Sequence, residues 1–378
     1  QDHADLINRV NREFVQKKGD VKPLIVVGTR YCNGWGPDMQ TYFKPFFSSL
    51  DDDIVVMWTG ANTMSAITKE AYEWPWWNYP VNDYCDGNLM MSPLENLDND
   101  VDNLSGFFLN PMSQAEASKV AIFSGADYSW NIGDFERTSS WKRAIAELVP
   151  EANEAFERFA DNISYIKDGF EFDESRYLVE DITNFQTALK NNMGIKEAAE
   201  VLKADFTQMK EDVALLRNIN NANLLEEITM HLNAYEAVAE AGIASMNAFI
   251  AAQDGTNITQ TEIKLNESET YQIESLETNG TKMNVVKVGE KRIKPLLRDS
   301  ISQIKDLLMD TVFPQANPAV IGTMEGIDEV KVIAAQGNYT INDVAGTLNS
   351  GESIGIRLPK AMEVGSIATE IGTAEGVK

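Results

Sequence analysis

The stretch that decides the fold is Trp76-Trp77-Asn78-Tyr79-Pro80-Val81-Asn82-Asp83-Tyr84. It predicts a short buried strand that ends at Pro80 and releases Asn82, Asp83 and Tyr84 into a loop. Aromatic rings pack against the C–H faces of a sugar, and amide and carboxylate groups pair with its hydroxyls. The composition therefore indicates a carbohydrate site. The alternative is an aromatic-rich strand end whose polar atoms cap the next element.

Apolar runs on either side of this stretch alternate with segments of helical periodicity, as in successive αβ units. Polar and aromatic residues collect where the runs end, which is the ligand-binding edge of a parallel sheet. The pattern predicts about half of a (β/α)8 TIM barrel, its C-terminal half. A Rossmann-like sheet is the alternative, but no Gly-x-Gly-x-x-Gly turn supports it. The expected elements are helices over 5–18, 41–50 and 114–120, strands over 23–28, 54–58, 76–81 and 121–130, and a helix-to-strand connection over 101–109.

The remainder of the chain changes character twice. From 140 to 253 the periodicity is helical, which predicts an antiparallel bundle. Beyond Asp254 the composition shifts to Thr, Asn, Ser and Gly, and a turn signal at Asn279-Gly280 predicts a hairpin within a partial β-sandwich. A helix is expected over 295–312, with strands over 262–265, 271–273, 283–288, 329–334, 337–341 and 353–358. The predicted domains are the barrel half over 1–138, a helical bundle over 139–255 and a β-rich region over 256–378.

The composition limits the possible chemistry. A formal charge of −26 argues against nucleic-acid binding, because phosphate contacts need a basic stripe. No apolar run reaches the length of about eighteen residues that a membrane span requires. The chain has two histidines and two cysteines, which are too few to favour a histidine- or cysteine-based metal site or a Ser-His-Asp triad. No cofactor is expected, and any acid–base chemistry would depend on carboxylates.

Five separated stretches occur in one order along the chain: GDVKPLI over 19–25, MWTG over 57–60, WWNYPVNDY over 76–84, LNPM over 109–112 and ADYSWN over 126–131. Together they resemble the bacterial β-N-acetylglucosaminidases of glycoside hydrolase family eighty-four, the O-GlcNAcase family, some of whose members are labelled hyaluronidases. The likeness is dense over residues 1 to 145 and looser beyond. It implies a catalytic barrel, a helical domain and often a galactose-binding-like sandwich, one strand of which residues 351–359 weakly resemble.

The resemblance implies a substrate-assisted retaining mechanism, an exception to the usual two-carboxylate scheme. One carboxylate orients the 2-acetamido group, whose carbonyl oxygen attacks C1, while a neighbouring carboxylic acid protonates the leaving oxygen. In the family this pair is an adjacent Asp-Asp, and alignment puts it before Gln1. Asp51-Asp52-Asp53 precedes a strand, at the wrong end of the barrel, and is expected to be a solvated turn. The chain by itself is therefore expected to contain no catalytic residue and to be inactive.

The resemblance assigns the other wall of the sugar pocket to five residues of this chain. Tyr31 would hydrogen-bond near the acetamide oxygen, and Trp76 would pack against the N-acetyl group. Asn78 and Asp83 would hold polar groups of the sugar, with Asp83 accepting from the distal hydroxyls. Asn110 would complete that clamp. Four further residues would support the pocket by packing: Trp58, Asn82, Tyr128 and Trp130.

One departure from the family concerns the link between Trp58 and Trp76, which is shorter by about the length of a crossover helix. Either one barrel helix has shrunk to residues 67–73, or the sequence has an internal deletion. The leading hypothesis is a fragment of a secreted or cell-surface bacterial β-N-acetylglucosaminidase that acts on terminal N-acetylglucosamine (GlcNAc) of glycans or glycoproteins. A glycan-binding attachment module and an inactive pseudoenzyme relative are the alternatives.

Overall fold

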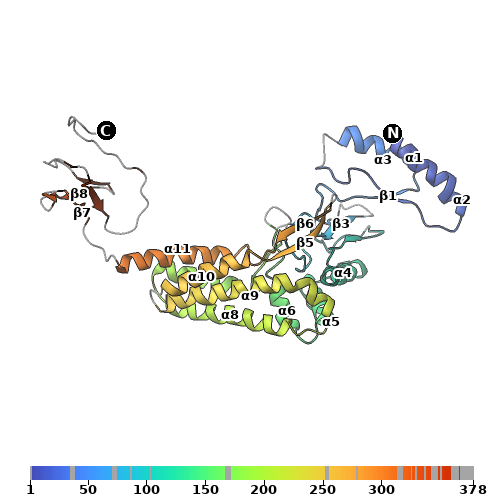
Figure 1. Ribbon diagram of the computed structural model, residues 1–378. Coiled ribbons are helices and arrows are strands. Elements are labelled where there is room, and N and C mark those ends of the chain that lie inside the picture. Colours follow the sequence, from blue (N-terminus) through green and yellow to red (C-terminus); the bar gives the residue numbers. More distant parts are fainter. Residues whose placement is uncertain are drawn as a thin grey trace.

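A computed structural model of the chain shows an N-terminal part of short strands and helices, a long helical part, and small β pairs toward the C-terminus (Figure 1). None of the helices it describes is both long and apolar enough to cross a bilayer. The described residues are 2–34, 39–69, 75–85, 87–102, 104–166, 172–251, 255–277, 280–312, 318–324, 326–327, 330–335, 338–341, 348–349, 351–358 and 366.

Four short parallel strands form the framework of the N-terminal part. β1 (Ile25–Val27) pairs with β2 (Val55–Met57), and β3 (Trp76–Pro80) pairs with β4 (Phe108–Asn110). A parallel bridge between the residue after β2 and the residue before β3 joins the two pairs. The strands thus follow one another in sequential order, as neighbouring strands of a β/α barrel do. The described residues contain no closed barrel.

Helical segments precede the first two strands, as the sequence predicts. The first is continuous but includes one turn of wider, π-helical pitch, and it ends at Gly19, whose φ of +70° suits the left-handed position that terminates a helix. The segments are α1 (Asp2–Val10), η1 (Asn11–Val15) and α2 (Gln16–Lys18) before β1, and η2 (Met39–Phe43) and α3 (Lys44–Phe47) before β2.

The connections on either side of β3 contain no helix in their described residues. Before β3, Ile67 forms a parallel bridge with Leu97, so this part of the proposed shrunken helix is extended. The remainder of that segment, 70–73, lies outside the described residues. After β3, the described residues before β4 include no part of the helix predicted within 101–109, and only the strand end of that prediction is confirmed.

Helix α4 (Ala115–Trp130) corrects the strand predicted over 121–130. Its buried residues Ala117, Ala121, Ser124 and Tyr128 recur at helical spacing. Small residues dominate this buried face, so its helical period is not visible in the pattern of large apolar residues. The large apolar residues alone therefore indicate a strand, although the segment is a helix. A Cβ at Gly125 would lie 2.5 Å from the Leu109 side chain, so α4 approaches β4 more closely than a larger residue permits.

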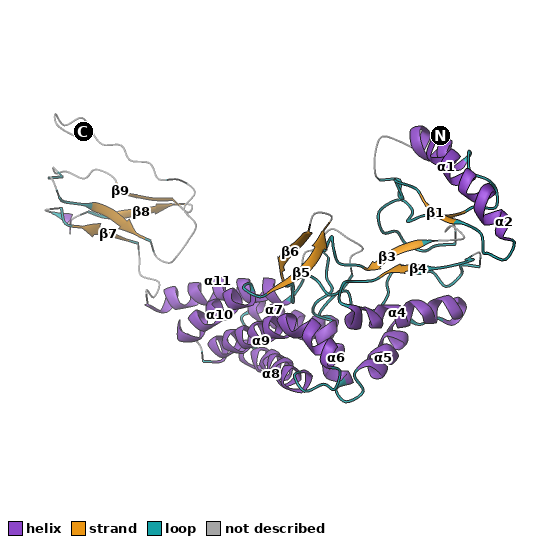
Figure 2. Cartoon of the chain, turned by 45° about the vertical axis from the view of Figure 1, so that its right-hand side comes forward, coloured by secondary structure: helices purple, strands orange, loops and turns teal. Residues whose placement is uncertain are grey.

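The helical part is a bundle, as predicted, and it is larger than predicted. Gly242 lies where α9 crosses α8, because a Cβ there would be 2.3 Å from the Phe206 ring. Helices α10 and α11 also pack against α9, and Figure 2 shows them side by side with it. The bundle comprises α5 (Arg137–Leu148), α6 (Asn153–Ala160), η4 (Arg176–Leu178), α7 (Val179–Asn191), α8 (Ile195–Leu216), α9 (Ala222–Ile250), α10 (Gly255–Ser268) and α11 (Ile293–Val312). A short 3-10 turn, η3 (Ile132–Asp134), precedes it.

Helix α10 replaces the strand predicted over 262–265. Its buried positions Ile258, Thr261, Leu265 and Ser268 have helical spacing and face the bundle. The predicted β-rich region therefore starts with a helix that belongs to the core around α9. The domain boundaries at 138 and 255 stay predictions.

Short antiparallel pairs complete the described chain. β5 (Gln272–Glu277) and β6 (Gly280–Val285) form the predicted hairpin, although Asn279 of its turn lies outside the described residues. Further pairs join β7 (Ala319–Gly322) to β10 (Ile354–Arg357) and β8 (Val332–Ala335) to β9 (Asn338–Ile341). The described residues of this part form no sandwich, and a galactose-binding-like module is not shown.

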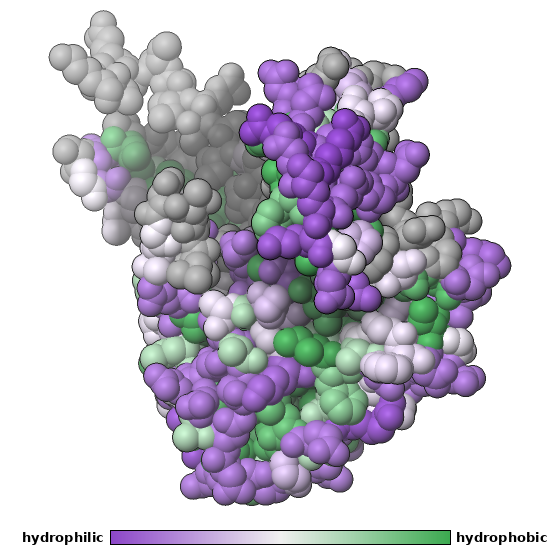
Figure 3. Space-filling model, turned by 90° about the vertical axis from the view of Figure 1, so that its right-hand side faces the viewer, coloured by the Kyte–Doolittle hydropathy of each residue, from purple (hydrophilic) through white to green (hydrophobic). Residues whose placement is uncertain are grey.

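The surface is mostly polar, as the strong negative charge requires. On the face in Figure 3, apolar side chains nevertheless gather in the middle, between polar residues above and below. The main apolar core extends from β3 through α9 to α11, whereas the buried residues Phe43, Phe46 and Trp58 near β1 and β2 lie outside it. The strand that the sequence predicts to be central is thus attached to the helical bundle.

Candidate functional site

Residues of β3 alternate between two faces of the sheet. Trp77 and Tyr79 are fully buried, and Tyr79 stacks on Phe172 with ring centroids 4.8 Å apart. Trp76 and Asn78 lie two residues apart on the opposite face, because successive side chains of a strand point to opposite sides. The alternation separates a core face from the face that holds the predicted site.

Two aromatic rings from different strands meet on this face. Tyr31 follows β1 and lies against Trp76 of β3, with ring centroids 4.9 Å apart and ring planes inclined by 44°. The Tyr31 carbonyl accepts hydrogen bonds from the backbone N–H of Thr59 at 3.0 Å and from its hydroxyl at 2.8 Å. Thr59 follows β2, so the exits of β1 and β2 and the start of β3 are fixed relative to one another.

Two amide side chains are linked beside these rings. Asn110, at the end of β4, donates from Nδ2 to Oδ1 of Asn78 at 3.1 Å. Asn78 donates from its own Nδ2 to the Thr63 carbonyl at 2.7 Å, which fixes the orientation of its amide. Asn78 is 5% exposed and Asn110 is half-buried. Among the described residues, no donor bonds to Oδ1 of Asn110.

Asp83 lies in the loop that follows β3 and is exposed. The pKa of the Tyr31 hydroxyl is raised, first by its partial burial, then by the neighbouring Cys32 and by the negative charge of Asp83. Asp83 is therefore close enough to act electrostatically on Tyr31. Tyr31, Asp83 and Asn110 lie at or beyond the carboxyl ends of β1, β3 and β4, whereas Trp76 is the first residue of β3 and Asn78 its third.

Two of the four predicted supporting residues hold this arrangement. Trp58 is 3% exposed, and its ring meets the Phe43 ring edge-on with centroids 4.3 Å apart. Its carbonyl accepts from the backbone N–H of Trp76 at 2.9 Å. Asn82 is buried and donates from Nδ2 to the Asn88 carbonyl at 2.9 Å and to Oε1 of Gln114 at 3.0 Å.

The other two supporting residues lie on α4, because the segment that contains them is a helix and not a strand exit. Tyr128 is buried, and its hydroxyl donates to the Asp98 carbonyl at 2.7 Å. Its ring packs against Phe107, which itself lies against Trp77. Tyr128 thus supports the core face of β3. Trp130 is 90% exposed at the end of α4, so the expectation that it packs behind the pocket is wrong.

The acidic triplet at residues 51–53 is engaged elsewhere. Arg12 of the first helix forms a two-pronged ion pair with Asp51, its Nε lying 2.8 Å from Oδ2. Asn11 donates to Asp53 at 2.8 Å, and Gln16 does so at 3.0 Å. The triplet precedes β2, at the opposite edge from the candidate site. Asp52 and Asp53 are exposed, as expected for a solvated turn, but Asp51 and Asp53 also bond to the first helix.

Sequence reasoning missed the two residues that orient the site from behind, Thr59 and Thr63. A local signal exists for the first, because Thr59 is followed by Gly60 with a φ of +93°, which marks a tight turn at the exit of β2. Thr63 contributes only its backbone carbonyl, which no sequence pattern distinguishes. Within the described chain, no three histidine, cysteine or acidic side chains are grouped in a way that could hold a metal ion.

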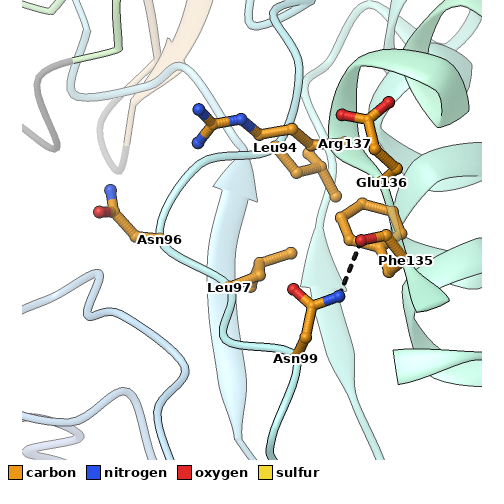
Figure 4. A pocket seen from close by; sticks show the side chains of 7 residues that line it. All are labelled: Leu94, Asn96, Leu97, Asn99, Phe135, Glu136 and Arg137. Atoms are coloured by element: carbon orange, nitrogen blue, oxygen red, sulfur yellow. Dashed lines mark hydrogen bonds between the residues drawn. The ribbon is translucent and has the colours of Figure 1, made fainter. Parts of the chain in front are cut away.

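A cavity of about 230 Å³ lies away from these residues, beside the start of α5 (Figure 4). Asn99 closes one side, where its Nδ2 donates to the Phe135 carbonyl at 2.8 Å and the Ile132 carbonyl at 3.0 Å. The Glu136 carboxylate caps the N-terminus of α5. These polar groups are satisfied within the protein, so the cavity does not resemble a sugar site. Its lining is Leu94, Asn96, Leu97, Asn99, Phe135, Glu136 and Arg137.

Two family models match the chain. Residues 1–161 match a model described as beta-N-acetylglucosaminidase. Residues 177–282 match a model described as a hyaluronidase post-catalytic domain-like region. The boundary between the two falls between α6 and η4, where the bundle continues without a break in its core.

Solved structures also resemble the chain. CpGH84D is 27% identical with a TM-score of 0.72, over 81% of this chain and 54% of that one. CpGH84B is 27% identical with a TM-score of 0.67, over 79% and 54%. A mutant of the Thermobaculum terrenum O-GlcNAc hydrolase shares the fold, at 21% identity and a TM-score of 0.65 over 82% and 66%. The chain spans about half the length of the first two structures.

Proposed function

Because the chain belongs to the β-N-acetylglucosaminidases of glycoside hydrolase family eighty-four, we propose that it forms one wall of the sugar site of an enzyme that removes terminal β-linked GlcNAc from glycans or glycoproteins. The observation that supports this most directly is the Tyr31–Trp76 ring pair, which lies beside the hydrogen-bonded amides of Asn78 and Asn110. A ring surface next to oriented amides suits an N-acetyl group, which has both a methyl and an amide.

The polar groups define how the sugar would be held. The half-buried Oδ1 of Asn110 can accept a hydrogen bond from a sugar hydroxyl. The exposed carboxylate of Asp83 can accept from two adjacent hydroxyls, which is a stronger arrangement than a single bond. The acetamide would then lie on the Trp76 side, with the Tyr31 hydroxyl near its oxygen. The proposed pocket would thus contact both the acetamide and the distal hydroxyls of the sugar.

We further propose that cleavage is substrate-assisted, with the acetamide oxygen attacking C1, and that the pair of carboxylates it needs is supplied by sequence outside residues 1–378. The adjacent aspartates of this chain, Asp51 to Asp53, are bonded to the first helix at the opposite edge of the strands. They therefore cannot reach a sugar placed against Trp76. On this proposal the 378-residue chain binds GlcNAc weakly and does not hydrolyse its glycosides.

The test is a titration of the 378-residue chain with GlcNAc and with glucose, followed by NMR, together with an assay of an aryl β-N-acetylglucosaminide. Saturable binding of GlcNAc, much weaker binding of glucose and no measurable turnover are expected. Equal binding of the two sugars would mean that the acetamide is not recognised at this site. Measurable turnover by this chain would overturn the proposed source of the carboxylate pair.

A further inference from the structure

The loop between β3 and Ser92 presents Asp83, and it is the part of the candidate site that the strands do not fix. Asp83 is exposed, so its own burial does not determine its position. It lies within a tight turn, in which the N–H of Cys85 bonds to the Asn82 carbonyl at 3.2 Å, and a second turn follows, in which the N–H of Asn88 bonds to the Cys85 carbonyl at 3.0 Å. The place of Asp83 therefore depends on how the two sides of this loop are anchored.

One anchor lies on the side of α4 and the β3 exit. Asn82 is 5% exposed and bonds to Gln114, the residue that precedes α4. The backbone N–H of Val81 also donates to the Asn110 carbonyl at 2.7 Å. These bonds fix the residue before Asp83 to the end of β4. Asn82 also donates to the Asn88 carbonyl at 2.9 Å, and Gly87, just before Asn88, has a further anchor in a different part of the protein.

The second anchor is the carbonyl of Gly87. It accepts from Nε2 of His231, on α9, at 2.7 Å and from the backbone N–H of Lys287, just after β6, at 3.1 Å. The φ of Gly87 is +89°, and a Cβ there would lie 1.9 Å from the Val285 carbonyl oxygen. Only glycine permits this approach, so the loop is seated directly on the hairpin and on the long central helix.

His231 makes this contact from within the core. It is fully buried, and burial lowers its pKa to about 4, so the imidazole is neutral at the pH of most assays. Because the Gly87 carbonyl can only accept, we assign the ring proton to Nε2. Nδ1 is then a buried acceptor, and no hydrogen-bond partner for it occurs in the described part of the chain. An apolar residue would avoid that cost but could not donate to Gly87.

We propose that His231 is a positioning residue of the sugar site, which holds Gly87 and thereby sets the place of Asp83. The effect on GlcNAc binding rests on the proposed function, whereas the hydrogen bond from His231 to Gly87 does not. It means that the helical bundle takes part in sugar binding although none of its residues lies among those predicted to contact the substrate. The His231 bond acts at Gly87, beside the hydrogen bonds that Ile163, Ser164 and Tyr165 form with the later loop residues Asn88, Leu89 and Met91.

The experiment compares His231→Ala, His231→Gln and Met246→Ala in the 378-residue chain, well below the unfolding temperature of each. Gln can place an amide N–H close to the position of Nε2, whereas Ala cannot. Met246 is equally buried on the same helix, so its variant is a control for general loss of packing. Two quantities are measured: the affinity for GlcNAc, with Asp83→Ala as reference, and the rates of amide hydrogen exchange at Cys85 and Asn88.

We expect His231→Ala to weaken GlcNAc binding about tenfold, as the loss of one hydrogen bond to a buried acceptor should, and to speed exchange at Cys85 and Asn88 by a similar factor. His231→Gln should restore both quantities to within about threefold. Met246→Ala should lower the melting temperature and leave both quantities unchanged. Equal effects of His231→Ala and Met246→Ala would reduce His231 to a packing residue and overturn the proposal.

The two arms separate this inference from the proposed function. One possible outcome is that the wild-type chain binds GlcNAc, that Asp83→Ala abolishes this binding and that His231→Ala does not change it. In that case the positioning role is refuted, but the proposed sugar site is not. If the wild-type chain binds no GlcNAc, the proposed function fails. The exchange rates then still decide whether His231 holds the loop.

Discussion

Neighbouring residues of β3 have opposite roles, and this is the main result at the scale of single residues. Trp77 and Tyr79 fill the core, whereas Trp76 and Asn78 face the site. The period of two that strands impose explains why both pairs occur within four consecutive positions. One face of β3 carries a ring and an amide, and the other carries large apolar groups. This combination explains the unusual composition of the stretch.

Two tryptophans offer a matched test of this division. We expect Trp76→Ala to weaken GlcNAc binding about tenfold or more, because a half-buried ring in contact with a ligand contributes strongly to affinity. Trp130→Ala should have no effect on binding, since that side chain is 90% exposed on α4. Titration of both variants with GlcNAc checks the prediction. A similar loss in the two variants would show that the sugar does not contact Trp76 specifically.

The residues that the sequence could single out are those whose own side chains are assigned to contact the sugar. The resemblance assigns the sugar contacts to Tyr31, Trp76, Asn78, Asp83 and Asn110, and these contacts stay predictions. His231 and Gly87 were not foreseen. The role of His231 depends on a carbonyl 144 positions away along the chain, a pairing that no local pattern contains.

At the scale of elements, close packing decides where the helices lie. The crossing of α8 and α9 brings Gly242 within 2.3 Å of the Phe206 ring, measured from an added Cβ. The same argument applies to Gly125 of α4 against Leu109. In both places the missing side chain allows two elements to approach more closely than ordinary core residues would permit.

Substitution at the crossing of α8 and α9 should therefore be costly. We expect Gly242→Ala to lower the free energy of unfolding by about 1–3 kcal/mol, because the added methyl group overlaps a buried ring. Gly133→Ala is the control, since nothing lies within 4 Å of its added Cβ. Urea unfolding of both variants, followed by circular dichroism, provides the measurement. An unchanged midpoint for Gly242→Ala would mean that the helices can separate without cost.

Element types were predicted correctly where the period was strong. The strands over 23–28, 54–58 and 76–81 and the long helices α8 and α9 are confirmed. The strand predictions over 121–130 and 262–265 are wrong for one shared reason. Small or polar residues such as Ser124 and Gly125 of α4 and Thr261 and Ser268 of α10 interrupt the buried faces, so the apolar residues alone do not reveal a helical period.

At the scale of the whole molecule, a buried polar junction connects the bundle to the segment between the hairpin and α11. Glu174 is 1% exposed, and its carboxylate accepts a hydrogen bond from the backbone N–H of Lys291. Arg292 forms an ion pair with Asp173 at 2.6 Å. Burial raises the pKa of Glu174 to about 8, whereas Arg292 and Lys291 lower the pKa of Asp173 to about 2 against the opposing effect of its partial burial.

The raised pKa of Glu174 predicts how global stability depends on pH. The folded state holds this proton more tightly than the unfolded state, whose glutamate titrates near 4.5. Stability from this group is therefore fully present below about pH 4.5 and is lost as the pH rises toward about 8. The loss should be on the order of several kcal/mol.

Glu174→Gln isolates this contribution, because Gln is always neutral and can keep the bond to Lys291. The difference in free energy of unfolding between the variant and the wild type should grow in favour of the variant from pH 5 to pH 8. Denaturant unfolding at several pH values measures it. A difference that does not change with pH would show that Glu174 is charged in the folded state throughout this range.

The sequence by itself determined the parallel strands, their polar and aromatic exits and the helical bundle, because these depend on local periodicity and on the side chains of consecutive residues. The five residues of the proposed sugar wall come from a resemblance of motifs and stay a prediction. Only the tertiary structure decided that α10 and α11 join the core around α9 and that His231 reaches the loop of Asp83. Such contacts depend on which surfaces meet after the helices pack, and that information is spread over residues far apart in the chain.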